Sequence, residues 1–207
     1  MGLSQAQLHA ALDALGTHEP IFARALDAAG YPEPRIRERG HVTLLRTIIG
    51  QQVSVAAAAS IWGRMEGAFG TMADVAPLAG ASDETLRAVG LSRQKAGYVR
   101  SLAGEVASGR LDFTALPADD EDAIAALTRI KGIGRWSAEI YLLFAEGRPD
   151  IWPAGDLAVQ AEIGRLFCHP ERPSEKVLRT MAEAWRPHRG AAAIFAWHSY
   201  GIAAKVV

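Results

Sequence analysis

The sequence predicts an all-α protein. Three observations lead to this expectation: alanine and leucine dominate the composition, the alternation typical of strands is scarce, and glycine or proline interrupts the chain at short intervals. Hydrophobic residues make up 49% of the 207 residues, which is enough for a buried core. The length suits one globular unit or two small helical subdomains.

The helices can be placed in order from caps and breakers. The first is expected to begin after Ser4, a residue type that caps helices, and to run through Leu15. Pro20 suits the first turn of a second helix that would end near Gly30, and the segment 31–34 is expected to be a linker. Further helices are expected over 41–49, 54–69, 82–89, 92–108, 119–129, 134–145, 156–167, 174–185 and 188–204.

Charge and cysteine content narrow the function classes. The formal net charge is −1, so any nucleic-acid binding must come from local patches and backbone amides. The single cysteine, Cys168, excludes a disulfide within the chain and a four-cysteine cluster, and beside Leu166 and Phe167 it is expected to be buried. No run approaches the roughly 20 apolar residues of a membrane helix, and the start lacks the features of a secretory signal. We therefore expect a cytoplasmic protein without a membrane partner.

Residues 127–136 are expected to form a helix, a tight turn and a second helix. Gly132 and Gly134 allow backbone conformations closed to other residues and let another backbone come close. The turn ends at a helix N-terminus, where amides favour an anion, and Lys131 and Arg135 lie beside it. This is a candidate phosphate-binding turn, although the glycines taken alone favour an ordinary helix–helix turn.

A second motif follows a segment bracketed by Pro149 and Pro153, the clearest irregular stretch of the chain. After it, Asp156 stands where the loop becomes a helix. Aspartate is a preferred N-cap residue, and on local sequence alone capping explains its presence. About two helical turns and a short loop separate Asp156 from the hairpin, so the chain is able to return toward it.

Taken together, the hairpin, the next helix and the sequence Pro153-Ala154-Gly155-Asp156 resemble the helix-hairpin-helix DNA glycosylase superfamily. The two motifs together are much more specific than either alone. The resemblance implies two helical subdomains with a DNA-binding cleft between them. Residues 42–150 would form a central bundle with the hairpin, and residues 1–41 with 151–207 would supply the terminal helices.

Other segments are similar to the DNA-3-methyladenine glycosylase II branch of this superfamily. Segment 48–54 resembles the element that fills the space left by an extruded base, and 90–96 and 185–197 resemble further parts of that branch. The match covers roughly residues 40–200. That branch often carries an N-terminal β-rich domain, which we expect this chain to lack.

The resemblance implies a catalytic role for Asp156. Breaking the C1′–N bond of a nucleotide builds positive charge on the sugar. A nearby carboxylate either stabilises this charge or orients the attacking water. Enzymes of this kind first extrude the nucleotide from the duplex. Bifunctional members carry a lysine at the place of Trp136 that forms a Schiff base with the sugar. Tryptophan supplies no amine, so the resemblance implies a monofunctional hydrolase.

The resemblance also implies a base pocket. Trp136 and Trp197 correspond to its aromatic residues, whose indole faces attract a cationic alkylated base, although Trp197 is open to interpretation as a core residue. Ile140 and Leu157 occupy places where the larger family member has aromatic residues, which implies a wider pocket. Of the other tryptophans, Trp62 and Trp185 are expected in the core. Trp152 is expected to be either a loop anchor or a pocket wall.

The remaining implied contacts are to DNA and to a cation. Gln52 stands where the larger family member has an apolar residue that wedges into the duplex. The resemblance implies that the glutamine side chain fills the space left by the extruded base in its place. The implied DNA contacts are Gln51, Gln52, Lys131, Gly132, Ile133, Gly134 and Arg135. No cofactor is required, and a structural monovalent or divalent cation is implied at the main-chain carbonyls of Thr128, Ile130 and Ile133. The expected partner is double-stranded DNA containing damaged bases, bound by a monomer.

The expected function is excision of alkylated bases, of the 3-methyladenine type, by hydrolysis. A glycosylase for uracil or mismatched bases is the nearest alternative. The second alternative is a helix-hairpin-helix module that binds DNA without catalysis. In that case Asp156 only caps a helix. A helical interaction scaffold is a third, and in that case the hairpin is an ordinary turn.

Overall fold

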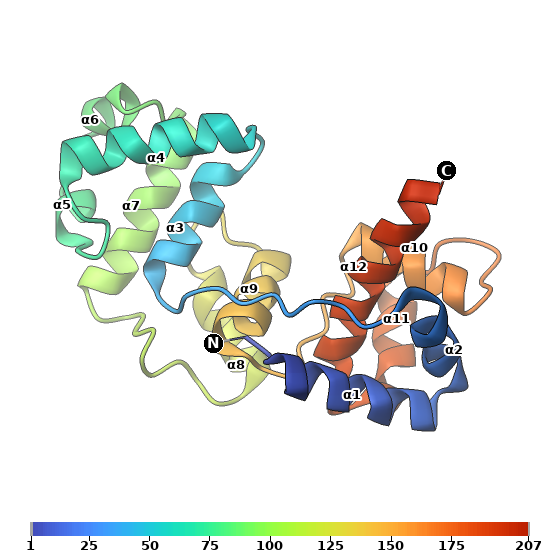
Figure 1. The fold of residues 1–207 in the computed structure, drawn as a ribbon. Coiled ribbons are helices and arrows are strands. Elements are labelled where there is room, and N and C mark those ends of the chain that lie inside the picture. Colours follow the sequence, from blue (N-terminus) through green and yellow to red (C-terminus); the bar gives the residue numbers. More distant parts are fainter. Residues whose placement is uncertain (1, 207) are drawn as a thin grey trace. The chain divides into compact units, whose positions relative to one another are not determined.

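The structure, a computed structural model, describes residues 2–206, with side chains through residue 204. Within that range it is helical and contains no strand, as the sequence predicts (Figure 1). The helices are α1 (Gln5–His18), α2 (Pro20–Ala29), α3 (His41–Gly50), α4 (Val55–Phe69), α5 (Ala76–Ala79), α6 (Asp83–Ala88), α7 (Arg93–Ala107), α8 (Asp120–Thr128), α9 (Arg135–Tyr141), α10 (Leu157–Leu166), α11 (Glu175–Met181) and α12 (Arg189–Val206).

Serine caps set several of the helix starts. The Ser4 hydroxyl accepts a hydrogen bond from the Gln7 amide, and the Gln7 side chain accepts one from the Ser4 amide, which completes a capping box. The same hydroxyl-to-amide cap begins four further helices, α4, α6, α7 and α11, at Ser54, Ser82, Ser92 and Ser174. The helix starts predicted from these residues are therefore confirmed.

Three details differ from the sequence expectation. The short helix α5 was not expected. The helix expected over 134–145 changes after Tyr141 into a π-helical turn, Leu142–Glu146, and the helix expected over 174–185 ends in a 3-10 turn, Ala182–Trp185. The residues of the π-helical turn are mostly buried, so tertiary packing sets the backbone there rather than local propensity.

The chain divides into two compact units. Unit 1 contains Met1–Arg37 and Leu142–Val207, and unit 2 contains Glu38–Tyr141. The sequence interpretation placed these boundaries at 41/42 and 150/151. The π-helical turn belongs to unit 1, where the Phe144 carbonyl accepts a hydrogen bond of 2.8 Å from the Arg37 amide.

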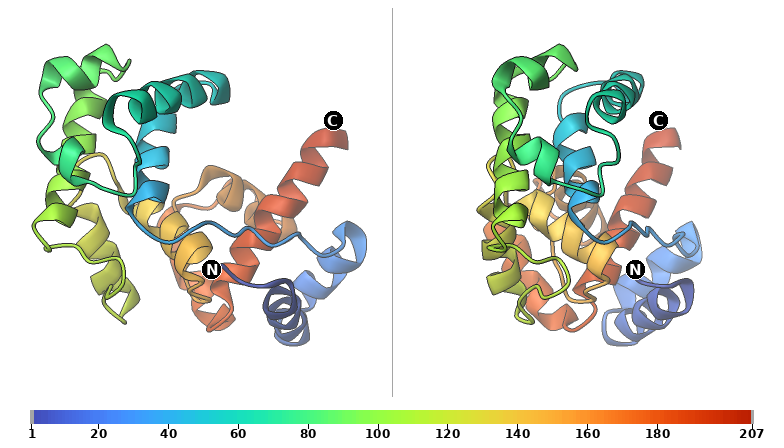
Figure 2. Two further views of the ribbon diagram at one scale, coloured as in Figure 1. Left: turned by 60° about the vertical axis from the view of Figure 1, so that its left-hand side comes forward. Right: turned by 90° about the vertical axis from the view of Figure 1, so that its left-hand side faces the viewer.

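The core of unit 1 surrounds Phe22 of α2. The Phe22 ring meets Trp185 edge to face, with centroids 5.2 Å apart, and also contacts Phe167 and Phe195. Helices α1 and α2 pack together and against α12, and α10 runs along α12 (Figures 1 and 2). Trp185 is buried, as predicted.

In unit 2, α3 packs against α4 and α7, and α7 also covers α5 and α6 (Figures 1 and 2). Buried apolar side chains from α3, α4 and α7 fill the space between these helices, and Trp62 is among them, as predicted. Helix α8 packs against α9, and this contact holds the two ends of the turn between them, residues 129–134, close together. This packing holds the predicted hairpin.

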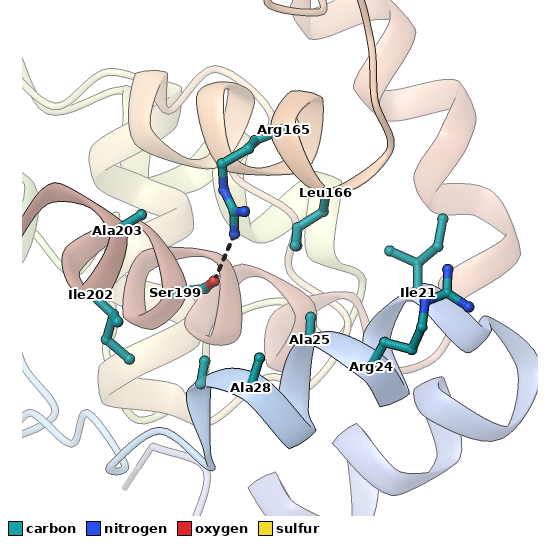
Figure 3. A pocket seen from close by; sticks show the side chains of 10 residues that line it. Ile21, Arg24, Ala25, Ala28, Arg165, Leu166, Ser199, Ile202 and Ala203 are labelled. Atoms are coloured by element: carbon teal, nitrogen blue, oxygen red, sulfur yellow. Dashed lines mark hydrogen bonds between the residues drawn. The ribbon is translucent and has the colours of Figure 1, made fainter. Parts of the chain in front are cut away.

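An open groove of about 370 Å³ lies in unit 1 between α2, α10 and α12 (Figure 3). Small residues such as Ala25 and Ala28 line it, and Arg165 reaches across it to donate a hydrogen bond of 3.3 Å to Ser199. The guanidinium also pairs with the buried carboxylate of Glu162. None of the predicted site residues lines this groove.

No helix in the described part of the chain has the length and apolarity needed to cross a membrane.

The expectation of a buried thiol at Cys168 is wrong. Cys168 is exposed, with a φ of +53°, immediately after the C-cap residue of α10. Its amide bonds to the Arg165 carbonyl, and the His169 amide bonds to the Gly164 carbonyl, which is the hydrogen-bond pattern of a Schellman motif. Ending the helix this way places the side chain in solvent despite its apolar neighbours.

Replacing Cys168 with glycine is expected to raise the free energy of unfolding by about 0.5–1 kcal/mol. A left-handed conformation costs a non-glycine residue about 1–2 kcal/mol, and the greater freedom of glycine in the unfolded chain offsets part of this gain. Urea unfolding of Cys168→Gly measures the change, with Cys168→Ala as a control that keeps the backbone cost. Equal stability of the two variants would contradict the interpretation.

Candidate active-site residues

In unit 1, the carboxylate of Asp156 caps helix α10. Its Oδ1 accepts hydrogen bonds from the amides of Ala158 at 2.9 Å and Val159 at 3.0 Å. Both amides belong to the first turn of α10, where the positive end of the helix dipole attracts an anion. The cap expected from the local sequence is confirmed. Capping also holds an anionic group in one orientation, so a structural role and a chemical one are compatible.

The loop before Asp156 is fixed by buried hydrogen bonds. The side-chain amide of Gln160 donates to the Ala154 carbonyl at 2.8 Å, and the Asp156 amide donates to the Pro153 carbonyl at 2.9 Å. Trp152 is buried and its indole nitrogen donates to the Leu178 carbonyl at 3.3 Å. Trp152 therefore anchors the loop, which was one of the two alternatives open from the sequence.

An ion-pair network holds the other end of this loop. Arg189, at the start of α12, binds both carboxylate oxygens of Asp150, at 2.8 and 2.9 Å. Arg186 joins the same carboxylate, and Glu183 pairs with both arginines. The segment 150–156 is thus tied to α12 at one end and to α10 at the other.

Trp197 of α12 is partly exposed, which argues against a purely core role. Its ring centroid lies 5.6 Å from that of Phe144. The guanidinium of Arg35 lies over the indole, with its carbon 5.5 Å from the ring centroid. Arg35 comes from the irregular segment between α2 and α3, and no sequence pattern pointed to it.

In unit 2, the hairpin turn depends on Gly132. Its φ is +86°, and a Cβ at this position would lie 2.2 Å from a ring carbon of Tyr98. The Lys131 amide donates to the Ser101 hydroxyl at 3.0 Å, and Ile130 and Ile133 are buried. Gly134, in contrast, has open space where a Cβ would stand. Helix α7 therefore holds the turn in place through the ring of Tyr98 and the hydroxyl of Ser101.

The segment that follows α3 is tied to this turn. The Gln51 side-chain amide donates to the Gly132 carbonyl at 2.9 Å, and the Lys95 ammonium donates to the Ile49 carbonyl at 2.7 Å. Gln52 comes next, exposed and with a φ of +56°. The structure thus joins Gln51 to the hairpin and presents Gln52 to solvent, in the same unit.

Arg135, predicted as a phosphate contact, already has carboxylate partners. Glu121 binds two of its guanidinium nitrogens, and Glu139 accepts from Nε at 2.9 Å. The hydrogen bond with Glu121 is the main reason that the pKa of Arg135 is raised. Because Glu139 is only 2% exposed, removal of Arg135 would leave a buried carboxylate without this counterion. The guanidinium therefore serves the fold of the hairpin first.

The remaining candidates differ in exposure. Trp136 of α9 is 47% exposed and Ile140 only 7% exposed, both in unit 2. Leu157 of α10, in unit 1, is 62% exposed next to Asp156. Lys131 is also exposed. Large exposed apolar side chains beside the two predicted motifs are available to contact a ligand.

The family of the chain follows from comparison with known proteins. Residues 45–187 match the model of the HhH-GPD superfamily base excision DNA repair proteins. The chain belongs to this superfamily. The DNA-3-methyladenine glycosylase 1 of Schizosaccharomyces pombe is 32% identical over 167 residues, 77% of this chain and 72% of that protein. The chain spans between 57% and 72% of the length of three curated relatives that it matches.

Solved structures of related proteins share the fold. A DNA-3-methyladenine glycosidase from Bacillus halodurans has a TM-score of 0.84 and 32% identity, covering 94% of this chain and 91% of that one. The Schizosaccharomyces pombe 3-methyladenine DNA glycosylase, solved in complex with abasic DNA, has a TM-score of 0.74 and 28% identity, covering 90% and 94%. The resemblance drawn from the hairpin and the aspartate is thereby confirmed at the level of the family.

Replacing Gly132 with alanine is expected to lower the free energy of unfolding by about 2–4 kcal/mol, because the left-handed backbone and the Tyr98 ring both resist a Cβ. Gly134→Ala should change it by less than about 1 kcal/mol. Urea denaturation of both variants measures the difference. In a Tyr98→Ala background the cost of Gly132→Ala should shrink, and an unchanged cost would contradict the clash with Tyr98.

Proposed function

We propose that the chain is a monofunctional DNA glycosylase that excises alkylated bases of the 3-methyladenine type from double-stranded DNA. The observation that carries this proposal is Asp156, an anionic side chain fixed by two backbone amides at the start of α10. The family and the names of its relatives support it. The proposal includes a monomeric, cytoplasmic enzyme that associates with DNA.

Asp156 is proposed as the catalytic carboxylate. As the C1′–N bond breaks, both bonding electrons pass to the base, and positive charge builds on the sugar. An oriented carboxylate stabilises that charge or directs a water molecule to C1′. An alkylated base that is cationic in DNA leaves as a neutral molecule, so its departure needs little acid catalysis. The water oxygen bonds to C1′ and its proton passes to solvent, leaving an abasic site.

The hairpin is proposed to bind a DNA phosphate through its backbone. Residues 131–134 precede the start of α9, where backbone amides and the helix dipole favour an anion. Since Arg135 is held by two carboxylates and the Ile133 amide already donates to the Ile130 carbonyl at 3.0 Å, the amides of Gly132 and Gly134 would carry most of this contact, with the exposed Lys131 beside them. Phosphate contacts position a protein on the duplex without reading its sequence.

Gln52 is proposed to fill the space of the extruded base, because it is exposed and its neighbour Gln51 ties the turn to the hairpin. Trp136, Trp197, Ile140 and Leu157 keep their proposed roles as base-contacting residues. A cation held by main-chain carbonyls of the hairpin remains part of the proposal. Of these, the Ile130 carbonyl accepts the Ile133 amide at 3.0 Å and has a second lone pair for a metal, and Thr128 and Ile133 would supply the others.

Asp156→Asn is expected to slow base excision at least about 100-fold, because the amide removes the negative charge that stabilises the sugar cation. Asparagine caps helices as well as aspartate does, so folding should change little. The measurement is single-turnover excision from duplexes that each carry one lesion, followed by alkali to cleave abasic sites. DNA affinity, measured in parallel, should remain.

Asp119→Asn is the matched control. Asp119 caps α8 with the same geometry, its Oδ1 accepting from Glu121 at 2.9 Å and Asp122 at 3.0 Å. This variant should excise at the wild-type rate. If Asp156→Asn also keeps that rate, Asp156 is only a cap. Binding of the wild-type protein to abasic duplex without excision of any lesion would favour the non-catalytic module, and excision of uracil or mismatched bases alone would favour the alternative glycosylase.

Borohydride is expected not to trap the wild-type protein on a lesion-containing duplex. Trapping needs a neutral amine that attacks C1′, and Trp136 supplies none. Lys131 is assigned to the proposed phosphate contact instead. Efficient trapping would move the chain to the bifunctional class, and Lys131→Ala would then test the attacking amine. Lys95 is the second candidate to substitute, because burial lowers its pKa and favours the neutral amine.

A further inference from the structure

A cation of the protein itself lies over the aromatic ring proposed to contact the base. The guanidinium carbon of Arg35 is 5.5 Å from the centroid of the Trp197 indole. This distance is within the range in which a cation is attracted by an aromatic face. A cationic alkylated base would be drawn to an indole by the same force. Arg35 and such a base are therefore competitors for Trp197.

Neighbouring contacts fix this arrangement within unit 1. Arg37 lies over Phe144, with its guanidinium carbon 5.8 Å from the ring centroid, and Phe144 in turn contacts Trp197. The Arg37 amide donates to the Phe144 carbonyl at 2.8 Å, which anchors the backbone two residues after Arg35. The position of Arg35 over the indole is thus supported by its own segment.

Arg35 also shares an electrostatic environment with the proposed catalytic carboxylate. Loss of water around the guanidinium is the main cause that lowers the pKa of Arg35, although the residue as a whole is exposed, and the charge of Arg37 lowers it further. The negative charge of Asp156 acts in the opposite direction. An arginine side chain stays protonated in proteins, so Arg35 brings a full positive charge to the surroundings of Trp197 and Asp156.

We propose that Arg35 is a specificity-determining residue that shifts excision toward damaged bases that are neutral in DNA and away from cationic ones. This inference rests on the proposed function, since it assigns a role to a group beside the proposed base contact. It concerns the relative rates for two lesion classes and leaves the reaction type unchanged.

The chemistry of the leaving group gives the direction. When the C1′–N bond of a neutral base breaks, both electrons go to the base, which departs as an anion. A nearby guanidinium stabilises that anion by charge and hydrogen bonds until the proton released by the attacking water reaches the base. A cationic base departs neutral and gains nothing from Arg35, and before departure its positive charge is repelled by the guanidinium.

The test compares two duplexes that differ only in the lesion, hypoxanthine as the neutral base and 7-methylguanine as the cationic one. Single-turnover excision rates are measured for the wild-type protein, Arg35→Gln, Arg35→Lys and Arg37→Gln. Arg35→Gln should lower the ratio of the hypoxanthine rate to the 7-methylguanine rate about tenfold. Arg35→Lys keeps the charge and should retain most of the ratio. Arg37→Gln removes an equal charge from the same segment but keeps the backbone hydrogen bond to Phe144 that anchors it, and should change the ratio by less than about threefold.

The outcomes separate this inference from the proposed function. Excision of neither lesion, nor of any alkylated base, by the wild-type protein would overturn the proposed function itself. Excision of 7-methylguanine without hypoxanthine would overturn the role of Arg35 alone. Equal ratios for the wild-type protein and Arg35→Gln would do the same. A misfolded variant would lose both rates together, so a change in their ratio is not produced by loss of structure.

Discussion

Two hydrogen bonds, from the amides of Ala158 and Val159 to Oδ1 of Asp156, are the interaction on which the proposed chemistry depends. They begin α10, and in doing so they give the carboxylate a fixed orientation and a place at the positive end of the helix dipole. A catalytic anion needs both properties before substrate arrives. The surrounding structure maintains this arrangement, since Gln160 fixes the preceding loop and the Asp150–Arg189 pair fixes its far end.

The charge distribution shows what a protein of net charge −1 would offer to the proposed polyanionic partner. Several arginines are paired with carboxylates within the fold, among them Arg135 with Glu121 and Glu139. Such pairs stabilise the protein but offer less net charge to DNA. Under the proposed function, binding at the hairpin would then fall to backbone groups, and the turn that presents them requires glycine at position 132. The left-handed φ of Gly132, and the Tyr98 ring at the place where a Cβ would stand, show how closely that turn is specified.

The sequence predicted the parts of the structure that local interactions determine. The serine caps and the Asp156 cap involve residues two or three positions apart, so their patterns are visible in the chain. The contact of Arg35 with Trp197 and the bond from Gln51 to the Gly132 carbonyl join distant segments, and no local pattern encodes them. Cys168 was placed wrongly because its apolar neighbours suggested burial, whereas the helix ends there in a left-handed turn that exposes the side chain.

The arrangement around Trp197 bears on how a damaged base would be selected. In unit 1, Leu157 beside Asp156 is 62% exposed, so it is available to contact a base but does not enclose one by itself. Charge acts over longer distances and does not need a close fit. A carboxylate that favours the sugar cation acts on every substrate alike, whereas a guanidinium beside the base acts differently on neutral and cationic leaving groups. Under the proposed function, Arg35 and Asp156 would together make the charge of the base a basis for selection.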